Sequence, residues 1–209
     1  MSLARIIAML GAKKYATLIG YASHNHQINT VPLPAGVQAG DFCVVNYFKS
    51  FTIGGGAGAP WTTLDYANNG RASYRQLLPA DLTTPLVISN NTPVVVGVWR
   101  GPTRISALKS QIQYSGTFDA DMPGFTKSPE AIGILGLGTS DLTTPYTVTK
   151  PLGRFDNQRN ERDTTGTTGF AIVTGSITDI DGYPNGATLY VTSDLAAATK
   201  WFRAYELLP

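Results

Sequence analysis

The apolar residues of this 209-residue chain fall into short runs separated by turn-forming residues, and this spacing limits the fold more than any other feature. Runs of about 4 to 8 residues rich in Val, Ile, Thr and Tyr are typical of β-strands. Gly and Pro supply 22 and 13 residues and stand between many of these runs. Helical patterns of about 10 to 15 residues, which a parallel βαβ sheet needs, are almost absent. The sequence therefore predicts an all-β fold, an antiparallel β-sandwich or jelly roll.

The predicted strands share β-branched or aromatic residues and end at turn residues. They are Thr17–Ala22, Phe42–Phe48, Ser73–Leu78, Leu86–Ser89, Val94–Trp99, Gln111–Tyr114, Ile132–Leu137, Tyr146–Thr149, Phe170–Thr174 and Ala187–Thr192. The segment 193–209 has two interpretations, because Ser193 suits a helix cap while residues alternate as in a strand from Trp201 onward. We expect a strand over Lys200–Leu207, after a single helical turn at Ala196–Ala198.

The N-terminal residues differ in character from the rest of the chain. We expect a short helix over Leu3–Leu10 and predict that residues 1–14 form an anchor segment before a single β-sandwich domain of residues 15–209. The apolar centre Ile6–Leu10 is shorter than the roughly 7 to 15 residues of a secretion signal. No stretch approaches the roughly 20 apolar residues of a membrane span. These lengths predict a soluble protein that folds in a reducing cytoplasm.

Charge and cysteine content exclude several classes of function. The 16 basic and 14 acidic residues leave a net charge of +2, too small for a surface that binds phosphate groups or anionic lipids. We therefore expect no nucleic-acid partner and no membrane insertion. The single cysteine, Cys43, excludes an internal disulfide, and its apolar neighbours predict a buried side chain rather than a catalytic thiol. Trp99, at the end of an apolar run, is also predicted to lie in the core.

The metal-binding motifs in the sequence are incomplete. His24 and His26 could share one face of a strand, but no third ligand accompanies them, and a solvated loop is the better interpretation. Asp179 and Asp181 resemble the start of a calcium loop, yet Tyr190 stands at the twelfth position, where a bidentate Glu is required. We therefore predict no metal site.

Catalytic patterns are equally incomplete. A glycosidase needs two carboxyl groups about 5 to 9.5 Å apart, and Asp119 and Asp121 could share one strand face, but they lie in a turn-like sequence. The glycine run Ile53–Pro60 lacks the GK[ST] ending of a phosphate loop. The sequence therefore predicts a non-enzymatic protein with no catalytic residue and no cofactor.

Candidate partner contacts lie in a predicted loop and among turn residues. The segment 153–169 has no apolar period and is predicted to be a long surface loop, the kind of segment that often carries contacts. Exposed aromatic rings among turn residues stack on sugars or fill a partner's pocket. The predicted partner-binding residues are Arg154, Arg159, Arg162, Tyr66 and Tyr183.

Four segments of the N-terminal half follow one another in a characteristic order: LPAGVQAGDFCVV (Leu33–Val45), PWTTL (Pro60–Leu64), ASYRQLL (Ala72–Leu78) and VVVGVWRGP (Val94–Pro102). They comprise a Pro-Ala-Gly-Val-x-Ala-Gly-Asp turn before an apolar strand, a Trp-Thr segment, a Tyr-bearing strand, and a strand ending in an aromatic residue, a basic residue and Gly. This order resembles a sequence pattern of bacteriophage virion proteins. Pro60 replaces the usual Gly before the Trp, and the second half matches through its final YELLP.

The resemblance implies a structural β-sandwich of a tailed bacteriophage virion, associated with the tail or its fibres and contributing to particle assembly or host-surface contact. Its partners would be other virion proteins and further copies of itself, as a trimer or higher homo-oligomer assembled in the bacterial cytoplasm. A head decoration or cement protein is one alternative, and a carbohydrate-binding module for a host-surface glycan is another. In the Ala-Gly-Asp turn, we expect the Asp41 carboxylate to accept a hydrogen bond from the backbone two residues on.

Overall fold

The computed structural model describes residues 16–209 except for the segments 25–29, 49–52, 55–59, 66–69, 89–93, 106–108, 114–117, 122–129, 139–153, 163–169, 179–187 and 192–198. Side chains are described for residues 16–24, 30, 32–47, 60–63, 71–87, 94–105 and 207–209. Apart from one short 3-10 helix, η2 (Pro79–Leu82), the regular elements of the described part are β-strands. Each strand pair is antiparallel. The all-β, antiparallel prediction is therefore confirmed.

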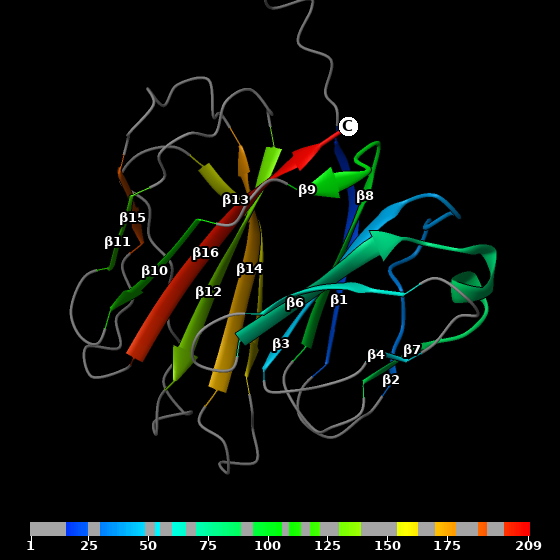
Figure 1. The fold of residues 1–209 in the computed structure, drawn as a ribbon, viewed down its shortest axis with the longest axis horizontal. Coiled ribbons are helices and arrows are strands. Elements are labelled where there is room, and N and C mark those ends of the chain that lie inside the picture. Colours follow the sequence, from blue (N-terminus) through cyan, green and yellow to red (C-terminus); the bar gives the residue numbers. More distant parts are fainter. Residues whose placement is uncertain are drawn as a thin grey trace, which may run out of the picture.

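A five-stranded sheet forms the best described half of the molecule (Figure 1). In order across the sheet, its strands are β1 (Thr17–His24), β8 (Val94–Arg100), β3 (Phe42–Phe48), β6 (Gly70–Gln76) and β5 (Thr62–Asp65). The register places Trp99 of β8 opposite Phe42 of β3, and Val98 opposite Cys43. Residues distant in the sequence are thereby neighbours in the middle of the sheet.

A second sheet has six strands and lies beside the first in Figure 1. Its order is β10 (Lys109–Gln113), β16 (Thr199–Leu208), β12 (Glu130–Gly138), β14 (Phe170–Thr178) and β13 (Arg154–Arg162), and β9 (Arg104–Ile105) pairs with the end of β16. Strands β13 and β14 contact β1, β3 and β8 of the first sheet. The two larger sheets are thus in direct contact.

Two small sheets complete the described elements. Strands β2 (Thr30–Val31), β7 (Leu86–Ile88) and β4 (Ile53–Gly54) form one of them, and β11 (Phe118–Asp121) pairs with β15 (Thr188–Val191) in the other. The short strand β2 leads into the segment 32–41, which runs to the start of β3.

The central strands β3 and β8 are buried on both faces of the five-stranded sheet, which explains why β8 is apolar at nearly every position. On one face, the Trp99 cluster consists of Ala16, Phe42, Val44, Ala72, Val95, Trp99 and Leu207. On the other face, the Cys43 cluster consists of Cys43, Val45, Tyr47, Leu77, Leu86, Val94, Val96 and Val98. The burial predicted for Trp99 and Cys43 is confirmed, since neither side chain is exposed.

Strand β1 is irregular where the segment 32–41 crosses it. Its pairing with β8 shifts register between Leu18 and Gly20. A Cβ atom on Gly20 would lie 3.1 Å from the Cβ of Pro34, so the proline ring packs closely over this part of the strand. Glycine at position 20 therefore allows the segment to lie against β1.

Most predicted strands coincide with observed ones. Phe42–Phe48 is confirmed at both ends, and the C-terminal strand is confirmed as Thr199–Leu208, one residue longer at each end than predicted. The observed strand Gly70–Gln76 begins three residues before the predicted Ser73–Leu78 and ends two residues before it. Leu77 still exchanges backbone hydrogen bonds with Gly40 and Asp41, and the carbonyl oxygen of Leu78 accepts the first hydrogen bond of the turn into η2. The predicted helix Leu3–Leu10, the strand Tyr146–Thr149 and the turn Ala196–Ala198 lie outside the described residues.

The prediction of a surface loop over 153–169 is wrong for its first half, which forms β13 (Arg154–Arg162). This strand pairs along its length with β14, with an irregularity between Asp156 and Arg159. It stands at the end of the strand order in its sheet, and charged residues are common on edge strands because they oppose pairing with further chains. The absence of an apolar period therefore indicated an edge strand as well as it indicated a loop.

The packing of Trp99 gives the first testable prediction. A Cβ atom at Gly97 would lie 2.2 Å from the Trp99 ring and 2.8 Å from that of Tyr21. Trp99 is fully buried and meets Tyr21 edge to face, with ring centroids 5.7 Å apart, so it has little room to move. We expect Gly97→Ala to lower the free energy of unfolding by about 1–3 kcal/mol, measured by urea denaturation.

The matched control is the same substitution in a Trp99→Leu background, where the indole ring is gone. Because the two residues are in contact, the cost of Gly97→Ala should fall sharply there. If Gly97→Ala lowered the free energy of unfolding equally in both backgrounds, a clash with the Trp99 ring would not be the cause.

Candidate functional site

The polar groups of the described residues form no obvious catalytic arrangement. Among the residues with described positions, no three His, Cys, Asp or Glu side chains stand close enough to share a metal ion. Two Asp–Arg pairs are the main charged contacts whose geometry is described, and they hold the two walls of one surface groove.

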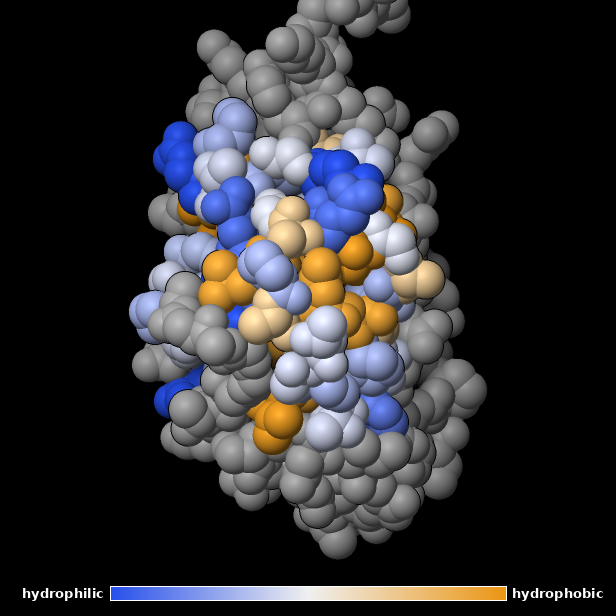
Figure 2. Space-filling model, turned by 90° about the vertical axis from the view of Figure 1, so that its right-hand side faces the viewer, coloured by the Kyte–Doolittle hydropathy of each residue, from blue (hydrophilic) through white to orange (hydrophobic). Residues whose placement is uncertain are grey.

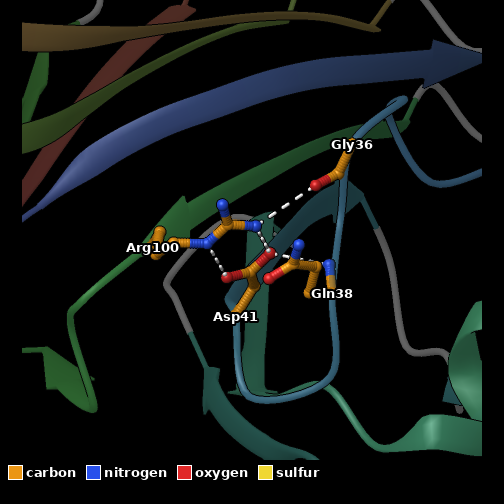
Figure 3. Close-up of polar contacts among 4 residues, drawn as sticks. All are labelled: Gly36, Gln38, Asp41 and Arg100. Carbon is orange, nitrogen blue, oxygen red and sulfur yellow. Dashed lines mark hydrogen bonds and ion pairs between the residues drawn. The ribbon is translucent and has the colours of Figure 1, made fainter.

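The first pair joins Asp41, at the start of β3, to Arg100, at the end of β8 (Figure 3). The Nε of Arg100 donates to Oδ1 of Asp41 at 2.8 Å, and its Nη2 donates to Oδ2 at 2.9 Å. The same Nη2 donates to the carbonyl oxygen of Gly36 at 3.2 Å. This two-point contact fixes the direction of both side chains and ties the segment 32–41 to the sheet.

The backbone around Asp41 explains why the carboxylate lies there. Gly36 and Gly40 have φ of 83° and 89°, a region that glycine adopts without strain. The N–H of Asp41 donates to the carbonyl oxygen of Gln38 at 3.1 Å, and the N–H of Gln38 donates to Oδ2 of Asp41 at 2.8 Å. The prediction that Asp41 bonds to backbone two residues on is therefore wrong in its partner, which lies three residues before it.

The surroundings of Asp41 favour its charged form. Burial by itself raises the pKa of this carboxyl group, but the hydrogen bonds from Arg100 and from the Gln38 N–H, together with the charge of Arg100, outweigh it. The net result is a pKa below the ordinary value for Asp, and the hydrogen bond to Asp41 raises the pKa of Arg100. The pair is therefore ionised at neutral pH.

The second pair, Asp81 of η2 with Arg75 of β6, is more deeply buried. The carboxylate contacts the Arg75 guanidinium through Oδ1 and accepts a hydrogen bond from the Leu78 N–H at 2.7 Å through Oδ2. The guanidinium also lies over the Trp61 ring, 4.6 Å from its centroid, as in a cation–π contact. Pairing is what allows both charges to be buried.

Between the two loops that these pairs hold lies a groove of about 300 Å³. One wall is Pro32, Leu33, Pro34, Gly36 and Val37, and the other is Asp81, Leu82, Thr83, Thr84 and Pro85. The side of the molecule that carries β2, β4 and β7 in Figure 1 faces the viewer in Figure 2, where hydrophobic surface gathers in the middle. Leu82 and Val87 are exposed at 43% and 39%, respectively.

The predicted partner-binding residues do not form one described cluster. Arg154, Arg159 and Arg162 pair with positions 178, 174 and 171 of β14, so the three arginines do not share one face of the sheet. Tyr66 and Tyr183 lie outside the described residues. Their role in partner binding stays a prediction.

The structure describes the positions of some of the other candidate residues named in the sequence analysis. Asp119 and Asp121 both lie on β11, at alternate positions, and Asp119 pairs with Tyr190 of β15. His24 ends β1, while His26, Asp179 and Asp181 lie outside the described residues.

Cys43 and His24 are too far apart for a thiol–imidazole pair. Gly20 of β1 and Cys43 of β3 both pair with Val98, whereas His24 pairs with Val94. Four residues along β8 correspond to about 13 Å. Burial, and secondarily the charge of Asp81, raises the pKa of the Cys43 thiol far above its usual range, with a smaller opposing effect of Arg75. The thiol therefore stays protonated.

The two Asp–Arg pairs were not found from the sequence, because their members are 59 and 6 residues apart and meet through sheet pairing or a turn. The sequence does contain a feature from which the Asp41–Arg100 pair could have been predicted. Arg100 follows the buried run Val94–Trp99 directly, and Asp41 directly precedes the buried run that begins at Phe42. Charged residues at the same end of two adjacent antiparallel strands are candidates for pairing.

Comparison with known proteins adds no relative. No family model matches the chain, and no curated protein and no solved structure matches it. Among the residues that the structure describes, no helix has the length and apolar character needed to cross a membrane.

The Asp41–Arg100 pair gives the second prediction. Asp41→Asn keeps the size of the side chain but removes the charge that Arg100 contacts, and we expect it to lower the free energy of unfolding by about 1–3 kcal/mol. Arg104→Gln is the control, because Arg104 is exposed and makes one long hydrogen bond, 3.4 Å, to the Pro209 carbonyl oxygen. That change should stay within about 0.5 kcal/mol.

The lowered pKa of Asp41 also predicts how the effect of Asp41→Asn on stability changes with pH. A carboxyl group whose pKa is lowered by folding stabilises the fold above its unfolded pKa, about 3.9 for Asp, and loses this effect as the pH falls through the folded value. The stability difference between the native chain and Asp41→Asn should therefore be constant from pH 5 to 7 and shrink below about pH 4. A difference that grew on acidification would contradict the assignment.

Cys43 gives the third prediction. Because it is the single cysteine and is fully buried with a raised pKa, the folded chain should not react with a thiol reagent at pH 8. In denaturant, one equivalent should react at once. Thr62→Cys, at an exposed position of β5, is the control and should add one rapidly reacting thiol to the folded chain. Rapid labelling of native Cys43 would contradict the burial.

Proposed function

We propose that this chain is a non-enzymatic structural component of a tailed bacteriophage virion, associated with the tail or its fibres. In this proposal residues 1–14 are an anchor, and residues 15–209 are one β-sandwich in which the five-stranded and six-stranded sheets pack together. The chain acts as a homo-oligomer, a trimer or higher, contacts other virion proteins and is located in the virion. The sequence resemblance to phage virion proteins is the starting point.

The observation that supports the proposal is that the residues carrying the resemblance form one structural unit. The four matching segments contain β8 and parts of β3, β5 and β6, and these strands are consecutive neighbours in the order β8-β3-β6-β5. The Asp of the turn and the basic residue before the final Gly are Asp41 and Arg100, which pair with each other. Leu207, in the C-terminal YELLP, lies in the cluster around Trp99. The pattern thus has a physical basis in contacts between its own parts.

The described surface fits an assembly role. Among the described residues, the charged groups at the groove are paired, and the thiol of Cys43 is inert. A module present in several copies on a particle does not need high affinity in each contact, because several weak contacts add up to strong attachment. Contacts of this kind require a rigid surface, which the two Asp–Arg pairs provide.

The fourth prediction is the copy number of the chain in purified phage particles, measured by quantitative mass spectrometry against the major capsid protein. A tail or fibre position predicts a few to a few tens of copies. Hundreds of copies would contradict the tail position and favour a head decoration protein. Absence from the particles would overturn the virion proposal, and a glycan array that compares the native chain with Tyr66→Ala and Tyr183→Ala would then test the carbohydrate-binding alternative.

A further inference from the structure

The two larger sheets have the same order of strands. The first has the order β1-β8-β3-β6-β5, and the main path of the second has the order β10-β16-β12-β14-β13. In chain order, β10 is equivalent to β1, β12 to β3, β13 to β5, β14 to β6 and β16 to β8. With these equivalents, each strand pair of the first sheet has its counterpart in the second, and every pair is antiparallel.

The small sheets follow the same equivalence. Strand β2 pairs with β7 in the first half of the chain, and β11, at the equivalent place in the chain, pairs with β15 in the second. The place equivalent to β4 falls in 139–153, outside the described residues. The described strands therefore form two halves of one connectivity, the first ending with β8 and the second beginning with β10.

The two halves meet through strands that are not equivalent. Strands β13 and β14 of the second half contact β1, β3 and β8 of the first, and β10 lies on the far side of the second sheet from this contact (Figure 1). The equivalents of β13 and β14 in the first half are β5 and β6, and the equivalents of β1, β3 and β8 in the second half are β10, β12 and β16. A contact between unlike surfaces of like units is heterologous, and it can repeat from one unit to the next.

The described surface differs between the two ends of the first sheet in the way that this contact predicts. At the end that meets the second half, β1 is exposed at Thr17, and its other residues are partly buried. At the opposite end, Thr62 and Thr63 of β5 are both exposed. The end strands at the two unused surfaces also differ in charge, since β5 (TTLD) contains Asp65 and β10 (KSQIQ) contains Lys109. Opposite charges favour the approach of one surface to the other.

We propose that copies of this chain join through a second contact of the same kind, in which β5 and β6 of one copy meet β10, β12 and β16 of the next. Each copy has one surface of each type, so copies add head to tail until the rotation between them closes a ring. First and second halves then alternate around the ring, and the contacts within and between chains use equivalent strands. This inference rests on the homo-oligomer of the proposed function and names the surfaces that form it.

The first experiment mixes full-length variants that each carry one added cysteine and treats them with a short bis-maleimide cross-linker. Thr62→Cys on β5 and Ser110→Cys on β10 should give a product that joins two chains, found by mass spectrometry of the digest. Thr62→Cys mixed with Asn160→Cys, on β13, should give at least tenfold less, because β13 already lies against β1 of its own chain. The native Cys43 is buried and does not interfere.

Two results of this experiment would overturn the proposal. Equal yields with Ser110→Cys and Asn160→Cys would mean that β10 is not a preferred neighbour of β5. Efficient cross-linking of Thr62→Cys to a second copy of itself would mean that like surfaces meet, as in a two-fold contact.

The second experiment follows association as the protein concentration is raised. In sedimentation velocity, the full-length chain should pass from a single copy at high dilution to one closed species of defined size. Thr62→Cys should react rapidly with iodoacetamide in dilute solution and at least tenfold more slowly in concentrated solution. Ala35→Cys, exposed on the segment that crosses β1, should react at one rate throughout. A chain that stays a single copy, or that grows without limit, would overturn the ring.

The ring and the virion position can fail separately, because both experiments use the free chain. Absence of the chain from phage particles would overturn the virion proposal and leave the ring intact. A single copy in concentrated solution would overturn the ring, and the copy number in particles would still decide the virion position.

Discussion

The burial of the central strands β3 and β8 on both faces of the five-stranded sheet is the constraint on which the other described features depend. A sheet with an apolar run such as Val94–Trp99 in an interior strand cannot leave either face in water. The Trp99 cluster is completed by Leu207 from the far end of the chain, and the Cys43 cluster by Leu77 and Leu86 from the turn and strand that follow β6. The coverings of the two faces therefore come from different parts of the sequence.

Covering a sheet with loops creates a second requirement, because loop backbones carry polar groups that need partners. The structure meets it with one aspartate at the base of each loop. Asp41 accepts from the Gln38 N–H, and Asp81 accepts from the Leu78 N–H, while an arginine from the end of a neighbouring or preceding strand neutralises each carboxylate. The two loops thus use the same local design, an Asp that accepts the N–H three residues before it.

The sequence allowed good prediction of the parts that depend on local patterns. Strand β3 was predicted to the residue, and the strand predicted at Lys200–Leu207 is one residue longer at each end in the structure, because apolar runs and alternation report burial directly. Strand β13 was missed because its sequence, RFDNQRNER, has no apolar alternation, whereas its pairing with β14 is a backbone feature that such patterns do not report. The Asp–Arg pairs and the groove were missed for a different reason, since they require the order of strands in the sheet, which local patterns do not contain.

The irregular stretch of β1 has a consequence for how copies of this chain can associate. An edge strand with a regular ladder is a template onto which a strand from another molecule can be added. At β1 the shift in register between Leu18 and Gly20, with Pro34 packed over it, interrupts that template. A sheet whose one edge is interrupted in this way does not extend in both directions by strand addition. Open-ended fibre growth through this sheet is thereby disfavoured.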